Sequence, residues 1–66
     1  MTKYFAWYDN HSDPHGKPYW EGSGWVEAKS AARAAQKAKA DGCKWTTVCV
    51  TASTEHPTDK TLLARA

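Results

Sequence analysis

Three histidines and two cysteines are the residues of this chain that could hold a metal ion. His11 and His15 are four positions apart, whereas Cys43 and Cys49 are six positions apart. Structural zinc sites usually leave about two to four residues between paired ligands on a tight turn. A strand between the cysteines would separate them by roughly 20 Å, which also excludes a disulfide between them. We therefore expect no bound metal, no other cofactor, and free thiols, as is typical of cytosolic proteins.

An activated nucleophile is the second chemistry to consider, because Ser12 and Asp13 lie between His11 and His15. Loop residues that are adjacent in sequence rarely form a working catalytic triad. The chain also contains neither a Gly-x-Ser-x-Gly motif nor a phosphate-binding loop. The sequence therefore predicts a protein that is not an enzyme.

Basic side chains gather in one part of the chain. Residues 27–44 contain five basic and two acidic residues, whereas the remainder contains four basic and five acidic residues. In a helix, Arg33 and Lys37 lie one turn apart on the same face, with Lys29 one turn earlier. Lys39 lies on the flank of this strip. An exposed helix face is often charged without binding anything, but such a strip also suits phosphate groups or an acidic protein surface.

Aromatic residues are the other unusual feature, with four tryptophans, three tyrosines and one phenylalanine in 66 residues. Each large ring carries roughly 150–250 Å² of surface, so a core of this size cannot enclose all of them. Tyr8, Tyr19 and Trp20 flank a polar loop and are the rings that we expect at the surface. Exposed rings anchor protein interfaces and stack on unpaired bases. The predicted partner-binding residues are Lys29, Arg33, Lys37, Lys39, Tyr19 and Trp20.

Three predicted strands would position these side chains. Residues 3–9 and 43–52 are rich in β-branched and aromatic residues, which favour strands. Residues 19–28 can return as a strand beside the first one, and Gly22 and Gly24 indicate a bulge or a turn within it.

A helix is predicted over residues 31–41. Ser30 can cap its N-terminus, and Gly42 suits the left-handed position just beyond its C-terminus. Its inner face consists of alanine alone, at Ala31, Ala34, Ala35 and Ala38. We expect this face to approach the sheet closely, with large rings of the sheet filling the space that small side chains leave. The predicted fold is α+β, a small antiparallel three-stranded sheet with one helix packed across one face.

The chain length predicts a single domain over residues 1–66, with residues 53–66 as a flexible or loosely packed tail or one short helical turn. The N-terminus lacks the apolar stretch of a signal peptide, and no segment approaches the length of a membrane span. We therefore expect no membrane association and a cytoplasmic location.

Part of the chain resembles a known family. The residues that carry the resemblance are Val26-Glu27-Ala28-Lys29-Ser30, Ala34, Ala38, Cys43 and Thr47-Val48. They are similar, without gaps over residues 26–48, to small phage-encoded anti-CRISPR proteins that inhibit type I-F surveillance complexes. The resemblance implies a compact helix-on-sheet inhibitor whose basic residues bind where target DNA would be held. The chain differs from this family in two ways. Arg33, Lys37 and Lys39 do not occupy the helix positions at which the family has its basic residues. Residues 53–66 lack the aromatic strands that end the family's fold.

The leading hypothesis is a non-catalytic inhibitor from a phage or mobile element that binds a bacterial CRISPR–Cas effector complex in the host cytoplasm. It would act as a monomer or weak homodimer. The first alternative is a small single-stranded nucleic-acid-binding domain that stacks bases on its rings and contacts phosphates with the basic helix. The second alternative is a regulator or structural subunit that self-associates through aromatic surface.

Overall fold

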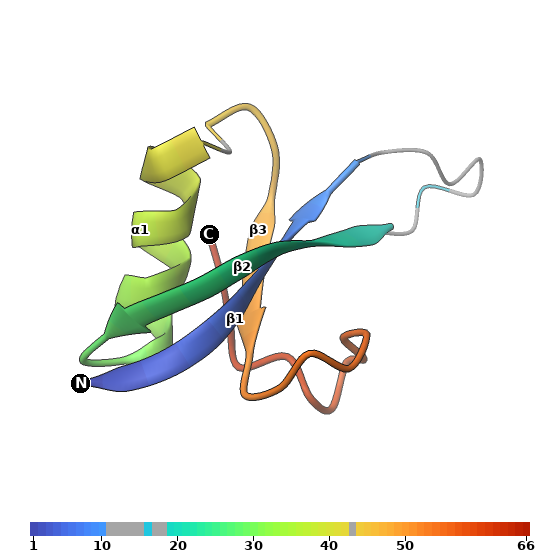
Figure 1. The fold of residues 1–66 in the computed structure, drawn as a ribbon. Coiled ribbons are helices and arrows are strands. Elements are labelled where there is room, and N and C mark those ends of the chain that lie inside the picture. Colours follow the sequence, from blue (N-terminus) through green and yellow to red (C-terminus); the bar gives the residue numbers. More distant parts are fainter. Residues whose placement is uncertain (11–15, 17–18, 43) are drawn as a thin grey trace.

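The structure, a computed structural model, describes residues 1–10, 16, 19–42 and 44–66. Four strands form one antiparallel sheet in the order β2-β1-β3-β4, and helix α1 lies across one face of it (Figure 1). The α+β class is confirmed, but the described sheet has four strands instead of the predicted three. The elements in chain order are β1 (Thr2–Asp9), β2 (Trp20–Ala28), α1 (Ala31–Gly42), β3 (Val48–Thr51) and β4 (Ala64–Arg65).

Strands β1 and β2 form a long hairpin with a bulge in β2. The pairing passes from Ala6↔Gly24 to Trp7↔Gly22, so β2 has one extra residue at this point. Gly24 has a φ of 152°, a conformation that side-chain-bearing residues rarely adopt. Gly22 allows a close approach, because a Cβ there would lie 3.0 Å from Cε2 of Phe5. The bulge predicted from the two glycines is confirmed.

Helix α1 begins as the sequence predicted and ends differently. The backbone N–H of Arg33 donates to Oγ of Ser30 at 3.2 Å, which makes Ser30 the N-cap. Gly42 is the last residue of the helix, and its φ is not positive. The left-handed conformation predicted for Gly42 is therefore wrong.

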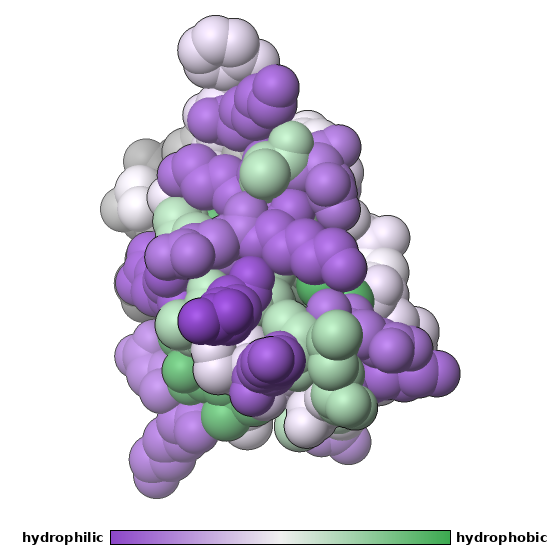
Figure 2. All heavy atoms as spheres, turned by 90° about the vertical axis from the view of Figure 1, so that its left-hand side faces the viewer, coloured by the Kyte–Doolittle hydropathy of each residue, from purple (hydrophilic) through white to green (hydrophobic). Residues whose placement is uncertain are grey.

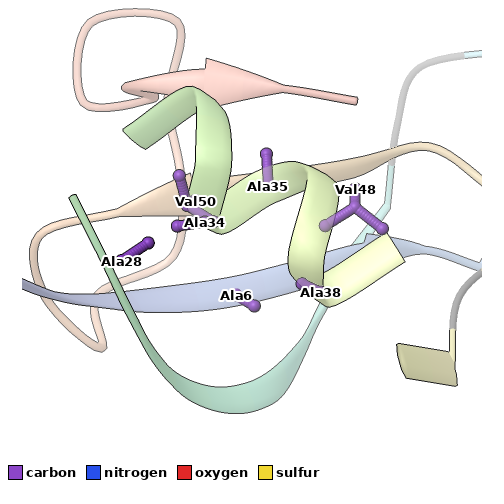
Figure 3. Close-up of a cluster of buried hydrophobic side chains, with 7 residues drawn as sticks. All are labelled: Ala6, Ala28, Ala34, Ala35, Ala38, Val48 and Val50. Atoms are coloured by element: carbon purple, nitrogen blue, oxygen red, sulfur yellow. The ribbon is translucent and has the colours of Figure 1, made fainter. Parts of the chain in front are cut away.

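The face of the sheet under α1 is packed with small side chains, which Figure 3 shows in close-up. Tyr4 and Tyr8 pack against the margin of this cluster and are only partly buried. The buried members come from the helix and from three strands: Ala6, Ala28, Ala34, Ala35, Ala38, Val48 and Val50. Small residues on both sides let the helix backbone approach the sheet closely.

Phe5, Trp7, Trp20 and Trp25 lie on the other face of the sheet, where the rings of Phe5 and Trp25 meet edge to face with their centroids 5.1 Å apart. Trp7, Trp20 and Cys49 are buried there, with Phe5 and Leu62 packed against them. The rings of Phe5 and Trp7 meet edge to face with their centroids 5.0 Å apart. The prediction that large rings fill the space beside the alanine face is wrong for these residues. The reason is that successive side chains of a strand alternate between the two faces.

Residues 53–66, which the sequence predicted as a loose tail, lie against the ring-bearing face and the edge of β3. Pro57 is buried, and Leu62 packs against Trp7 and Trp20. The backbone N–H of Leu63 donates to the carbonyl of Val50 at 2.9 Å, and Val48 and Ala66 exchange two backbone hydrogen bonds. Both faces of β3 are therefore covered, and all four of its residues are buried.

Candidate functional site

A basic groove lies where the end of β2 meets the first turns of α1. It has a volume of about 490 Å³ and is lined by Met1, Glu27, Ala28, Lys29, Arg33, Gln36 and Lys37. The structure thus brings together three of the four predicted basic residues. Figure 2 shows the side of the molecule that carries α1, where hydrophilic side chains cover much of the surface.

The cations of the basic groove differ in how they are held. Nζ of Lys37 donates a long hydrogen bond of 3.5 Å to the backbone carbonyl of Glu27. Within the part of the chain that the structure describes, the side chains of Lys29 and Arg33 form no ion pair. Both side chains are exposed, so their charges are available to an anionic group from outside.

Lys39 is the predicted basic residue that the structure leaves outside this groove. It is half-buried and does not line the groove. Two helical positions correspond to about 200° of rotation, so Lys39 projects from a different side of α1 than Lys37 does.

Trp20 does not belong to a partner-binding surface, and its prediction as an exposed anchor is wrong. Only 7% of its surface is exposed, and the guanidinium carbon of Arg65 lies 5.7 Å from the centroid of its ring. As the first residue of β2 it pairs with Asp9, and its side chain joins the ring cluster on the sheet.

Tyr19 is exposed, as predicted, but it lies far from the basic groove. Half of its surface is exposed, and its backbone N–H donates to Oδ1 of Asp9 at 3.0 Å. The whole of β2 separates Tyr19 from Lys29, and nine strand residues span roughly 30 Å. One compact contact therefore cannot include both residues.

Two exposed tryptophans were not predicted as site residues. Trp45 is 95% exposed and Trp25 is 52% exposed. Trp45 precedes β3, which begins only at Val48, so it has no sheet face to pack against. The sequence offered one indication that Trp45 is exposed, because its neighbours Lys44 and Thr46 are charged or polar.

A second hollow, here named the aromatic groove, lies at the C-terminal end of α1. Its volume is about 580 Å³, and its residues are Tyr8, Ser23, Gly24, Trp25, Val26, Ala38, Asp41, Gly42, Trp45 and Thr46. The ring of Trp25 points to the opposite face of the sheet, where it packs edge to face on Phe5. The hydroxyl of Tyr8 donates to the carboxylate of Glu21, which fixes the position of that ring at the margin of the helix-covered cluster.

The residues considered for metal binding and nucleophilic catalysis fall mainly outside the described part of the chain. They are His11, Ser12, Asp13, His15 and Cys43. Among the described residues, no group of three histidine, cysteine or acidic side chains is placed to hold a metal ion. Cys49 is buried with a free thiol, and burial raises its pKa to about 11, partly opposed by the charge of Arg65.

The described helix is too short to cross a membrane. Comparison of the chain with protein-family models, with curated proteins and with solved structures finds no match.

Proposed function

We propose that this chain is a non-catalytic binding protein that inhibits a bacterial partner by docking its basic groove on an acidic protein surface. The observation that carries the proposal is the exposed set of Lys29, Arg33 and Lys37 around one hollow, with Glu27 as the acidic residue beside them. Such a concentration of one charge speeds the encounter with a surface of opposite charge and selects against other partners.

The specific partner that we propose is a type I-F CRISPR–Cas surveillance complex, with the protein originating from a phage or a mobile element. The support is the resemblance over residues 26–48, which includes Lys29 and the cap residue Ser30. Residues 26–48 run from the end of β2 through α1 to the first residue of β3, and within them Lys29 lies in the turn between β2 and α1 and lines the basic groove. The resembling segment therefore contains most of the residues of this groove.

The test compares two double charge reversals that change the net charge equally. Lys29→Glu with Arg33→Glu alters the basic groove, whereas Lys44→Glu with Lys60→Glu alters exposed lysines outside it. We expect the groove variant to bind the purified surveillance complex roughly tenfold more weakly or worse, and the control variant to bind within about threefold of the original chain.

Equal binding by the groove variant and the original chain would reject the basic groove as the docking surface. If the original chain does not bind the complex, this partner is rejected. The control for folding is the melting temperature, which should stay within a few degrees of the original in both variants.

A single-stranded nucleic-acid-binding role receives less support from the structure. Trp7 and Trp20, which would be the stacking platforms on the sheet, are buried. The measurement that decides is an oligonucleotide titration at low salt, followed by tryptophan fluorescence. We expect no saturable change, and a change that weakens steeply with added salt would favour this role.

A Further Inference from the structure

We propose that the outer edge of β2 pairs with the same edge of a second copy of the chain, which gives a weak two-fold dimer. The two strands run antiparallel and pair over residues 25–27, with Val26 of one copy opposite Val26 of the other. The proposal goes beyond the function proposed for the basic groove, and it is tested without any partner protein.

The outer edge of β2 presents the backbone groups of Trp25 and Glu27. Within the part of the chain that the structure describes, β2 is bonded to β1 alone and forms one edge of the sheet. On β1, the backbone N–H of Asp9 donates to the carbonyl of Thr47 on the side of β3, so alternate residues of β1 face β2 instead. Val26 pairs with one of these alternate residues, so its backbone groups face β1 and those of its two neighbours face outward.

The side chain of Lys37 gives independent support for this direction. Its Nζ donates to the carbonyl of Glu27 at 3.5 Å, as expected of a carbonyl that is not bonded to β1. The bond is long and Lys37 is exposed, so a backbone N–H of an incoming strand can replace it. Lysine at a sheet edge weakens pairing, which is one reason why we expect a weak dimer.

The sequence of β2 leaves one register for the two-fold pairing. Regular pairing is limited to residues 25–28, because the bulge of residues 22–24 bends the strand before them. A register with Trp25 opposite itself would draw the bulge of each copy into the ladder. A register with Glu27 opposite itself would place two carboxylates against each other. The remaining register has Val26 at the two-fold axis, with Trp25 of each copy opposite Glu27 of the other.

The side chains of this register suit a second copy as the occupant of the edge. Val26 is half-buried and Trp25 is 52% exposed, so both have apolar surface left to cover. Two valines at a non-hydrogen-bonded pair lie close, with their Cα atoms about 4.5 Å apart. The two Trp25 rings become diagonal neighbours at roughly 7–8 Å, which aromatic side chains can bridge. The two-fold axis provides each of these contacts twice.

The first test is the association state of the full chain as a function of concentration. We expect sedimentation equilibrium to give a dissociation constant of about 0.1–1 mM, because only three residues of each strand pair. In the same concentration series, hydrogen exchange of the Trp25 and Glu27 amides should slow as the dimer forms. The Val26 amide, already bonded to β1, should exchange slowly at every concentration.

A matched pair of substitutions at one position tests the backbone contact. Glu27→Pro removes an N–H that points outward, and proline is tolerated at such a position of an edge strand. Glu27→Ala removes the same carboxylate and keeps the N–H. We expect Glu27→Pro to dimerise at least about tenfold more weakly than Glu27→Ala, with the melting temperatures of both showing that the fold is kept.

A second matched pair tests the register. Trp25→Lys and Trp25→Glu both lose the ring, but only the lysine faces an opposite charge at Glu27 of the second copy. We expect the lysine variant to dimerise at least about threefold more tightly than the glutamate variant. Thr54→Lys and Thr54→Glu, at an exposed position between β3 and β4, are the control for net charge and should dimerise equally.

Four results would overturn the proposal. A chain that stays monomeric at about 2 mM has no such dimer. Equal dimerisation of Glu27→Pro and Glu27→Ala would show that the edge of β2 is not the contact. Equal dimerisation of the two Trp25 variants would fit Trp25 opposite itself, and tighter dimerisation of the glutamate variant would fit Trp25 opposite Lys29. Either result would contradict the register with Val26 at the axis.

Discussion

Cys49 is a buried thiol in a strand whose two faces are both covered. None of its surface is exposed, and burial raises its pKa to about 11. At neutral pH the thiol is therefore protonated and a poor nucleophile, since the thiolate is the reactive form. We infer that Cys49 has a packing role.

The raised pKa predicts a loss of stability at high pH. The unfolded chain releases the proton near pH 9 and the folded chain near pH 11, so the free energy of unfolding should fall as pH rises through this range. The contribution is on the order of 2 kcal/mol. Urea unfolding at pH 8 and pH 11 measures it. Cys49→Ala should show a shallower decline, and an identical pH dependence of both proteins would contradict the assignment.

The hydrogen bond between Trp7 and Thr51 predicts a second effect on stability. Nε1 of Trp7 donates to Oγ1 of Thr51 at 2.9 Å in a buried position. Thr51→Val would leave the indole N–H without this acceptor, which should cost about 1–3 kcal/mol in the free energy of unfolding. Thr47→Val, at a half-buried threonine before β3, is the control and should change it by less than about 1 kcal/mol. A similar loss in both variants would argue against the hydrogen bond.

At the scale of elements, the alanine face of α1 fixes how closely the helix approaches the sheet. Ala34 and Ala35 have no exposed surface, and they face small residues of β1, β2 and β3. There is no room at this contact for a larger side chain unless the helix moves away.

Overpacking therefore predicts a difference between two alanines of the same helix. Ala35→Leu should destabilise the fold by about 1–3 kcal/mol or more. Ala40→Leu, at an exposed position, should change stability by only a few tenths of a kcal/mol, because leucine and alanine have similar helix propensities. Thermal unfolding followed by circular dichroism compares the two, and equal melting temperatures would show that the helix can shift at little cost.

The elements with a strong local signal could be predicted from the sequence. The helix, its cap at Ser30 and the bulge at Gly24 each depend on a few neighbouring residues. Strand β4 has only two residues and no pattern of its own, so its pairing with β3 depends on tertiary contacts.

The positions of the rings and of the candidate sites were harder to predict. Phe5 and Tyr8 lie on opposite faces of β1, and adjacent rings give no indication of which face meets the helix. Arg33 and Lys37 line one groove because helical spacing places them on the same face, whereas Lys29 reaches it from the turn before α1. The exposure of Trp45 depends instead on where β3 begins, and strand boundaries are poorly defined by sequence.

At the scale of the whole molecule, the sheet is covered on one face by α1 and on the other by residues from the segment between β3 and β4. This segment passes below the sheet in the view of Figure 1 and returns to form β4 at its edge. In a chain of 66 residues, such coverage is needed because a small domain buries only about 60% of its unfolded surface.

Removal of residues 62–66 tests this arrangement. The truncation deletes Leu62 from the ring cluster and removes β4, so one edge of β3 loses its partner while the other stays paired with β1. We expect a loss of most of the stability of the domain and self-association of the product, measured by thermal unfolding and sedimentation velocity. The matched pair Leu62→Ala and Leu63→Ala should show the larger loss at Leu62, since Leu63 is half exposed. A truncated chain that melts like the original would contradict this role.

The basic groove and the aromatic groove both border β2 and α1, one near each end of the helix. The helix residues that line them follow one another along α1, from Arg33 to Lys37 and from Ala38 to Gly42, so both grooves are held by one rigid element. A partner that contacts both grooves would lose its rotational and translational freedom only once. The second contact would form at a high effective concentration. Two individually weak contacts would then give a long-lived complex. A substitution that removes either contact would shorten the lifetime of the complex by much more than the weak affinity of that one contact predicts.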